Sequence, residues 1–216
     1  MKLRFPTEDG LTLEGELRMP GGDPVGTAVI CHPHPQHGGS KDHPLLWAIR
    51  SDLAGTRGFA VLAFNFRGVM GSEGEKGDGT EEVKDARAAI TRVREEAGGP
   101  TVVVGWSFGA TVALREATGD DRVAGLAIGG YPLADVAITR APLPPAEELR
   151  AFETPTLIVV ADDDRFSPVH AVLELTGTIP NAEVRVFEGA GHLFARRERE
   201  AAEAIGEFAA RVAQDR

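Results

Sequence analysis

The sequence predicts an α/β fold: a doubly wound, mostly parallel sheet with an antiparallel N-terminal hairpin and a short cap segment. Short, continuous apolar runs recur along the chain, and such runs are typical of parallel strands that are buried on both faces. Helical stretches separate these runs, and this alternation indicates parallel strands joined by right-handed crossovers. The run Thr101–Val104 ends abruptly at Gly105-Trp106-Ser107-Phe108-Gly109 before a helical stretch. That order of strand, tight turn and helix fits the same architecture.

The first element is a predicted hairpin. Leu3–Phe5 and Leu11–Arg18 alternate in polarity on either side of Thr7-Glu8-Asp9-Gly10. Because Asp-Gly is a favoured turn between two such runs, we expect an antiparallel pair of strands here. The pair is expected at an edge of the sheet.

The remaining strands are expected where the apolar runs lie, which is at Thr27–Cys31, Phe59–Phe64, Thr101–Val104, Val123–Ile128, Pro155–Ala161 and Ala182–Phe187. The clearest helix is Thr80–Ala97, in which apolar residues recur at helical spacing behind Thr80 as the expected cap. Further helices are expected at about Pro44–Thr56, Ser107–Thr118, Val169–Thr178 and Glu198–Ala213.

One segment, Tyr131–Glu153, interrupts the alternation of strand and helix. Its prolines at positions 142, 144 and 145 limit helix to the second half, about Ala146–Phe152. The segment is long enough for a small flap and too short for a separate domain. We therefore expect residues 1–216 to form a single domain with a short flap at about residues 131–153.

Composition and charge narrow the class of partner. The chain has 33 acidic and 23 basic residues and a formal net charge of −10, whereas nucleic acids and anionic membranes bind basic faces. No apolar run approaches the roughly 20 residues of a membrane span, and the N-terminus lacks the apolar stretch of a signal peptide. Cys31 is the only cysteine, so no intramolecular disulfide can form. We expect a cytoplasmic protein that acts on a small molecule, without nucleic acid or membrane as a partner; the sequence does not predict the oligomeric state.

The pentapeptide around Ser107 suggests a nucleophile. Only glycine at Gly105 and Gly109 lets the strand and the following helix approach each other so closely, and this lifts Ser107 out of the sheet. The helix after Ser107 would direct its free N–H groups and the positive end of its dipole at the same place. An oxyanion could be stabilised there.

The expected carboxyl ends of three strands carry polar residues in the order nucleophile, acid, base. Ser107 follows one strand, Asp162-Asp163-Asp164 follows another, and Gly191-His192 follows the last. A serine hydroxyl becomes a good nucleophile when an imidazole takes its proton, and a carboxylate fixes the tautomer of that imidazole. Ligands of doubly wound sheets bind beyond the carboxyl ends of the strands, so we expect these side chains to meet.

Several motifs together resemble the α/β-hydrolase superfamily, and in particular small bacterial hydrolases with little or no lid that are related to dienelactone hydrolases. The matching residues are Cys31-His32-Pro33-His34-Pro35 with Gly38-Gly39, Asn65-Phe66-Arg67-Gly68 with Gly71-Ser72, Gly105-Trp106-Ser107-Phe108-Gly109, Asp164 with Pro168, and Gly189-Ala190-Gly191-His192. The resemblance implies Ser107 as nucleophile, His192 as base and Asp164 as acid. It also implies an oxyanion hole formed by the backbone N–H groups of Phe108 and His34; Pro35 has no N–H to give.

Two positions depart from the family's pattern. Relatives usually have Arg-Gly-x-Gly where this chain has Arg67-Gly68-Val69-Met70, so the turn must be built differently or re-registered onto Gly71. Dienelactone hydrolases themselves have a cysteine nucleophile at the position of Ser107. The serine here argues against a dienelactone as the substrate.

Some residues have alternative interpretations. Asp162 and Asp163 compete with Asp164 for the role of the acid, and Asp135 after the preceding strand is a further candidate. The spacing of His32, His34 and His37 could bind a metal, but no carboxylate or cysteine cluster accompanies them, so backbone geometry explains them better. We expect no metal and no cofactor. Arg67 is expected to brace its loop by pairing with carboxylates or backbone.

The predicted function is hydrolysis of short-chain carboxylic esters by a Ser-His-Asp triad, because the short flap offers little apolar surface to a long acyl chain. Five residues are candidates for the substrate pocket: Trp47, Met70, Tyr131, Phe166 and Leu193. A thioesterase or a peptidase would use the same triad with a different pocket. A third possibility is a non-catalytic ligand-binding protein with the same fold.

Overall fold

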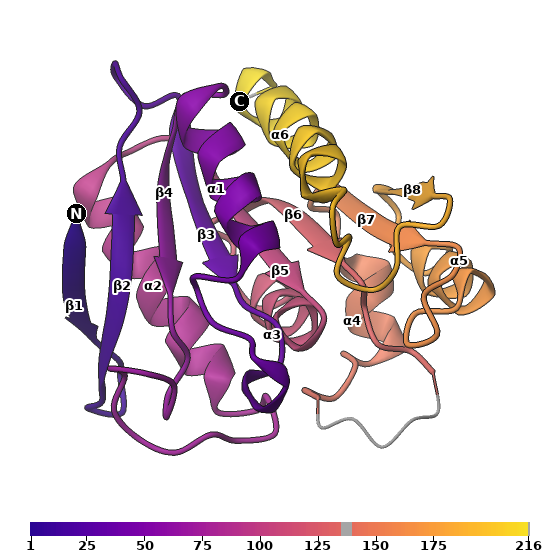
Figure 1. The fold of residues 1–216 in the computed structure, drawn as a ribbon, viewed down its shortest axis with the longest axis horizontal. Helices are drawn as coiled ribbons and strands as arrows, with labels where there is room; N and C mark the ends of the chain where they lie inside the picture. Colours follow the sequence, from indigo (N-terminus) through magenta and orange to yellow (C-terminus); the bar gives the residue numbers. More distant parts are fainter. Residues whose placement is uncertain (135–139, 216) are drawn as a thin grey trace.

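The computed structural model describes residues 1–134 and 140–215. Its strands form one eight-stranded sheet in the order β1-β2-β4-β3-β5-β6-β7-β8 (Figure 1). The strands are β1 (Lys2–Pro6), β2 (Thr12–Arg18), β3 (Gly26–Cys31), β4 (Phe59–Phe64), β5 (Thr101–Trp106), β6 (Val123–Gly129), β7 (Thr156–Ala161) and β8 (Ala182–Phe187). The helices are α1 (Pro44–Gly55), α2 (Glu82–Glu96), α3 (Phe108–Ala117), α4 (Ala146–Ala151), α5 (Val169–Thr176) and α6 (Glu198–Gln214), with a short 3₁₀ turn, η1, at Pro35–His37. The predicted α/β architecture is confirmed.

The N-terminal hairpin forms as predicted and provides one edge of the sheet. Strand β1 pairs antiparallel with β2, and β2 pairs antiparallel with β4. The turn is closed by a hydrogen bond of 2.8 Å from the Thr7 N–H to the Leu11 carbonyl, and Gly10 takes a left-handed φ of 88°. All other strand pairs are parallel, so the carboxyl ends of β3 to β8 lie along one edge.

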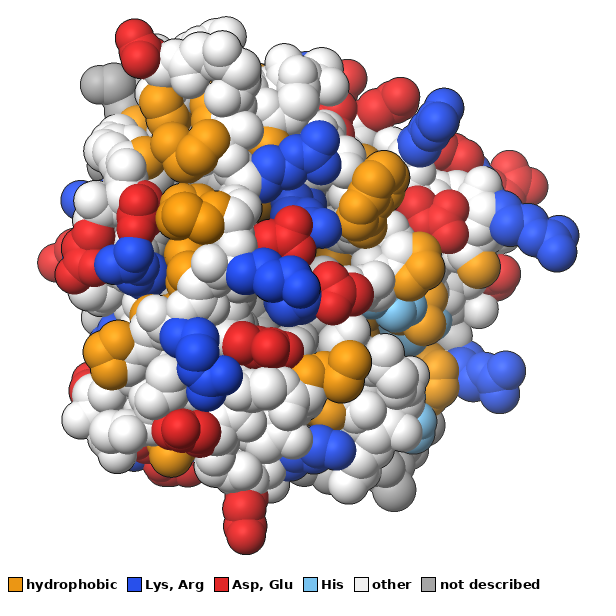
Figure 2. All heavy atoms as spheres, turned by 60° about the vertical axis from the view of Figure 1, so that its left-hand side comes forward, with side chains coloured by type: hydrophobic (Ala, Val, Ile, Leu, Met, Phe, Trp, Pro, Cys, Tyr) orange, Lys and Arg blue, Asp and Glu red, His pale blue; other side chains and the backbone are white. Residues whose placement is uncertain are grey.

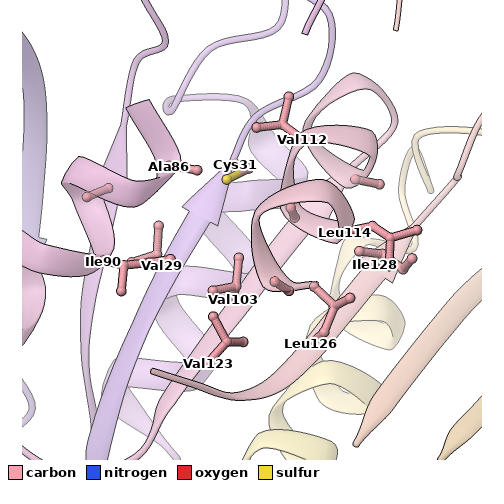
Figure 3. Close-up of a cluster of buried hydrophobic side chains, with 14 of the residues drawn as sticks. Val29, Cys31, Ala86, Ile90, Val103, Val112, Leu114, Val123, Leu126 and Ile128 are labelled. Atoms are coloured by element: carbon pink, nitrogen blue, oxygen red, sulfur yellow. The ribbon is translucent and has the colours of Figure 1, made fainter. Parts of the chain in front are cut away.

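The central strands are continuous apolar runs because both of their faces are covered. Every residue of β3, β5 and β7 is buried. Val29, Cys31 and Val103 contribute to a core cluster on one face, whereas Ile30 and Val104 contribute to a second cluster on the other. Figure 3 shows part of the first cluster, with Cys31 at the end of β3 beside helices α2 and α3.

Helices cover the two faces of the sheet in two groups. Helices α1 and α6 lie side by side over one face (Figure 1) and supply side chains to the second cluster. Helices α2, α3 and α5 supply side chains to the first cluster on the opposite face. This arrangement is the predicted double winding. The carboxyl ends of the parallel strands are left uncovered by these helices, and loops lie there.

Two local predictions are wrong. Strand β8 is an edge strand whose residues are half-buried or exposed, with Glu183 and Val186 exposed, because among the described residues no strand pairs with its outer side. Thr80 does not cap α2: the N-cap residue is Glu81, and it makes no side-chain cap bond. The N–H of Thr80 instead donates to Asp78 Oδ1 at 3.0 Å.

The surface carries charges of both signs. Figure 2 shows Lys and Arg interspersed with Asp and Glu over the face in view. Surface ion pairs of the chain include Arg185 with Glu207 at 2.7 Å. Among residues 1–134 and 140–215, no helix combines the length and the apolar character needed to cross a bilayer.

Candidate active site

Ser107 lies in a strained turn between β5 and α3. Its φ of 54° and ψ of −119° are outside the regions that non-glycine residues usually adopt. The close approach predicted for the flanking glycines is present: a Cβ on Gly105 would lie 2.4 Å from the Gly109 carbonyl oxygen. The Ser107 N–H donates to the Gly129 carbonyl at 2.8 Å, which ties the turn to the neighbouring strand β6.

Three side chains from separate loops form a hydrogen-bonded chain at this turn. His192 Nε2 lies 2.9 Å from Ser107 Oγ, and His192 Nδ1 lies 2.7 Å from Asp164 Oδ2. Ser107 and Asp164 are buried, whereas 17% of the His192 side chain is exposed. Solvent can therefore reach this set of three side chains at the imidazole of His192.

The protonation states follow from these contacts. Burial acts to raise the pKa of Asp164, but hydrogen bonds from His192 and from the Phe166 N–H outweigh burial and lower that pKa below its ordinary value. An ionised Asp164 accepts only, so the Nδ1 of His192 carries the proton and its Nε2 is free to accept from Ser107. This arrangement can move a proton from the serine hydroxyl to the imidazole.

The neighbouring aspartates, Asp162 and Asp163, do not touch the imidazole in the described residues. Asp162 Oδ1 accepts from the Gly189 N–H at 2.8 Å, and Asp163 Oδ1 accepts from the Gly191 N–H at 2.8 Å. Both side chains are exposed. The structure therefore brings Asp164, rather than Asp162 or Asp163, to His192; Asp135 lies outside the described residues.

The two predicted oxyanion donors belong to residues whose side chains touch. The rings of His34 and Phe108 pack edge to face with their centroids 5.1 Å apart. Gly109, next to Phe108, packs directly against the carbonyl groups of Cys31 and His32. Within residues 1–134 and 140–215, neither the Phe108 N–H nor the His34 N–H donates to a protein acceptor. Both groups are free to bind an anion.

The histidines before α1 are held by backbone contacts. His32 is fully buried: Nδ1 lies 2.6 Å from the Pro33 carbonyl, and Nε2 accepts from the Phe66 N–H at 3.1 Å. His34 Nδ1 accepts from the Gln36 N–H at 3.2 Å and caps η1. In the part of the chain that the structure describes, no group of three or more His, Cys, Asp or Glu side chains is arranged to hold a metal ion.

The loop after β4 is braced by Arg67. Its guanidinium pairs with the fully buried Asp85 at 2.7 Å and with Asp9 at 3.0 Å, so Arg67 has the bracing contacts expected of it. The turn that lacks the family's second glycine is built with Met70 itself in a left-handed conformation, at a φ of 50°. It is not re-registered onto Gly71.

The five candidate pocket residues lie in different environments. The Phe166 ring lies beside the His192 ring, with centroids 4.8 Å apart, and Leu193 packs against the second core cluster next to His192. Tyr131 is buried in the first core cluster. Trp47 and Met70 are 56% and 77% exposed, and in the described residues no hydrogen bond or aromatic contact joins either of them to Ser107 or His192.

Sequence reasoning missed two contacts at the site. The Trp106 indole Nε1 donates to the His192 carbonyl at 2.8 Å, and the Phe166 N–H donates to Asp164 Oδ1 at 2.9 Å. In the first contact, Trp106 and His192 lie 86 positions apart, so no local pattern in the sequence indicates it. The second bond belongs to the turn after Asp164, which the sequence shows only as a polar loop.

Comparison with known proteins gives a family and several structural relatives. A family model described as an alpha/beta hydrolase domain matches residues 28–215. Among curated proteins, an uncharacterized protein from Rickettsia prowazekii is 25% identical over 197 residues, which cover 84% of this chain and 77% of that protein.

Two solved structures are similar over nearly their whole length. An α/β serine hydrolase homologue from Coxiella burnetii is 28% identical with a TM-score of 0.83, covering 96% of each chain. An α/β serine hydrolase without a lid from Xanthomonas campestris is 25% identical with a TM-score of 0.81, covering 98% of this chain and 94% of that one. A Pyrococcus furiosus esterase, at 21% identity and a TM-score of 0.82 over 98% and 92% of the two chains, shares the fold.

Proposed function

The chain belongs to the α/β-hydrolase family, whose model matches residues 28–215, and we propose that it is a serine hydrolase that cleaves carboxylic esters of small molecules. The observation that carries the proposal is the hydrogen-bonded chain from Ser107 through His192 to Asp164, with contacts of 2.9 and 2.7 Å. We further propose that residues 1–216 act as a single hydrolase domain with a short flap.

In the proposed mechanism, His192 Nε2 takes the proton of the Ser107 hydroxyl while Oγ attacks the ester carbonyl carbon. Asp164 holds the imidazole in the required tautomer and stabilises the imidazolium that forms. The tetrahedral intermediate expels the alcohol, which receives the proton from Nε2, and an acyl ester on Ser107 remains. Water then repeats the sequence: His192 takes its proton, and the carboxylic acid and free Ser107 are released.

The backbone N–H groups of Phe108 and His34 are proposed to hold the oxyanion. The Phe108 N–H is the first of α3, where the positive end of the helix dipole favours negative charge. The His34–Phe108 ring contact brings the two residues together. Donors fixed in advance are effective because they need no reorganisation when the charge develops.

The proposed substrates are esters with short acyl chains. Phe166 and Leu193 flank His192 and are proposed as walls of the substrate pocket. In the flap, α4 has six residues, of which only Leu149 is buried, and that side chain packs into the core. Among the described residues of the flap, Leu143, at 45% exposure, is the one exposed large apolar side chain available to cover a long chain.

A strained serine argues for catalysis rather than for ligand binding alone. A left-handed backbone at a non-glycine residue costs about 1–3 kcal/mol, and a binding protein gains nothing from it. The same triad could serve thioesters or amides, so the test must compare all three bond types.

The experiment combines labelling with a panel of substrates. The purified chain is expected to react with a fluorophosphonate at Ser107, as located by mass spectrometry of peptides, and to turn over p-nitrophenyl acetate faster than an acyl thioester or an aminoacyl anilide. Ser107→Ala should lose labelling and roughly 10⁴-fold or more of the turnover. Ser51→Ala, at a half-buried serine of α1 whose Oγ accepts from Arg18 at 3.0 Å, is the control for loss of a serine hydroxyl elsewhere. Retention of more than a few per cent of the rate in Ser107→Ala would reject Ser107 as the nucleophile.

A further inference from the structure

The loop that carries His192 has a backbone that is costly to form. It runs from the end of β8 to the start of α6, and it contains left-handed residues at Gly189, Gly191, Phe194 and Arg196, with φ values of 60°, 65°, 51° and 70°. Two of these are glycines, which allow many conformations in the absence of other contacts. The other two adopt a conformation that non-glycine residues disfavour. Local preference therefore does not hold His192 in place.

Contacts from the carboxyl ends of β7 and β5 hold the loop instead. From the loop after β7, Asp162 Oδ1 accepts from the Gly189 N–H and Asp163 Oδ1 accepts from the Gly191 N–H, each at 2.8 Å. From the end of β5, Trp106 Nε1 donates to the His192 carbonyl at 2.8 Å. We call these three side chains, Asp162, Asp163 and Trp106, the loop clamp.

Two members of the loop clamp act on either side of the imidazole's own residue. The Gly191 N–H lies just before His192 and the His192 carbonyl lies just after its Cα, so Asp163 and Trp106 fix the backbone at both ends. This sets the direction of the His192 side chain toward Ser107 Oγ and Asp164. Trp106 is fully buried, and its ring also packs edge to face on Phe194, with centroids 5.2 Å apart.

We propose that Asp163 and Trp106 are positioning residues for His192, and that Asp163 acts by accepting a hydrogen bond rather than by its charge. The proposal rests on the proposed function, in which His192 is the base. Asp163 is exposed, so water and salt screen its charge, whereas its bond to the Gly191 N–H has a fixed direction. An asparagine at this position keeps the acceptor oxygen and loses the charge.

Asp163 and Asp164 should therefore respond in opposite ways to the same substitution. Asp163→Asn still offers Oδ1 to the Gly191 N–H. Asp164→Asn cannot hold His192 in the tautomer that accepts from Ser107, because fixing that tautomer needs a carboxylate. An acceptor role for Asp163 thus predicts rescue by asparagine at 163 and none at 164.

The experiment measures kcat and KM on the best ester found for wild type, Asp163→Ala, Asp163→Asn and Trp106→Phe. Misplacement of a catalytic group by about 1 Å can cost roughly 100-fold in rate, so we expect kcat to fall between 10- and 100-fold in Asp163→Ala and Trp106→Phe, with KM within about twofold. Asp163→Asn should recover most of the loss. Asp121→Ala, an exposed aspartate in the loop before β6, is the control for removal of a surface charge.

A second measurement does not need turnover. The proton on His192 Nδ1, held against Asp164, should give a low-field proton NMR signal in the wild type that broadens or disappears in Asp163→Ala and returns in Asp163→Asn. Thermal unfolding identifies variants that do not fold; if Trp106→Phe is one of them, the Asp163 pair decides the proposal.

Three results would overturn the proposal: wild-type kcat in Asp163→Ala, equal losses in Asp163→Ala and Asp163→Asn, or wild-type kcat in a folded Trp106→Phe. These results differ from failure of the proposed function, which would appear as activity and labelling that do not depend on Ser107. In that case the NMR signal of His192 still decides whether Asp163 holds the loop.

Discussion

Gly109, in the first turn of α3, lies directly against Cys31 at the end of β3: a Cβ on Gly109 would be 2.2 Å from the Cys31 carbonyl oxygen. This contact places the start of α3, with Ser107 and the Phe108 N–H, beside the loop that carries His34. The positions of the nucleophile and of both proposed oxyanion donors therefore depend on the absence of a side chain at position 109.

Gly109→Ala should consequently destabilise the protein and disrupt the site. The new methyl group would meet backbone rather than a flexible side chain, and overpacking of this kind costs about 1–3 kcal/mol. We expect a lower urea midpoint and a large loss of esterase activity in the fraction that folds. The control is Gly55→Ala, because a Cβ at the end of α1 has nothing within 4 Å. Wild-type stability and activity in Gly109→Ala would contradict the proposed packing.

Asp164→Asn should reduce kcat by roughly 10⁴-fold while leaving the fold intact. Asp164 Oδ1 already accepts from the Phe166 N–H at 2.9 Å, so an asparagine would keep its oxygen there and present its NH₂ to His192 Nδ1. The imidazole would then carry its proton on Nε2 and could not accept from Ser107. The measurement is kcat beside Asp162→Asn, which should stay within a few-fold of wild type. Similar mild losses in both variants would place the acid elsewhere.

His32 should make the protein less stable as the pH falls below neutral. Burial lowers the pKa of His32 to about 4 from an ordinary value of 6.5, and it outweighs the contact of Nδ1 with the Pro33 carbonyl, which acts to raise that pKa. The unfolded chain therefore binds the proton first. Stability that is fully present above pH 6.5 is lost as the pH falls toward 4, by up to about 3 kcal/mol.

The test compares urea midpoints at pH 7 and pH 5. His32→Asn should be less stable than wild type at pH 7, and the difference should shrink at pH 5, because the variant has no buried imidazole to protonate. His170→Asn, at an exposed histidine, is the matched control. An equal difference at both pH values would mean that His32 is not the source of the pH dependence. Burial also lowers the pKa values of His34 and His43, so these two histidines account for any pH dependence of the urea midpoint that persists in His32→Asn.

Much of the fold could be predicted because its strongest constraints are local in sequence. A strand covered on both faces is mostly apolar, as β3 and β5 are, and their buried polar residues, Thr27 and Thr101, hydrogen-bond to each other. The apolar residues of β8 predict the same burial, but β8 lies at the edge of the sheet, and its Glu183 and Val186 are exposed. Exposure of that kind depends on the order of strands in the sheet, which the sequence does not state.

The candidate site divides in the same way. The glycines at 105 and 109 indicate the turn at Ser107, because only a close approach of backbone explains them. Nothing in the residues themselves distinguishes Asp164 from Asp162 and Asp163, since the three carboxylates are chemically alike and differ only in where the loop directs them. The bond from Trp106 to His192 joins residues 86 positions apart, so it appears only when the chain is folded.

The last prediction concerns the length of the acyl chain. Residues 140–153 of the flap contribute one helix, α4, and its single buried residue, Leu149, packs into the core with Phe152. Tyr131, at the start of the flap, is also buried there. These apolar side chains therefore pack the flap against the core, and among its described residues Leu143 is the one large apolar side chain that remains exposed.

We expect kcat/KM to rise with acyl length from acetate to about butyrate or hexanoate and then to level off or fall. Each buried methylene stabilises a bound chain by about 0.8 kcal/mol, but only where protein covers it, and the described part of the flap covers few carbons. The measurement uses p-nitrophenyl esters from two to sixteen carbons below their solubility limits, with Leu149→Ala as a variant that loosens α4. Loosening should lower stability without extending the preferred chain length, because Leu149 packs into the core rather than over the substrate. A steady rise through dodecanoate in the wild type would show a deeper acyl tunnel and would contradict the short-chain preference.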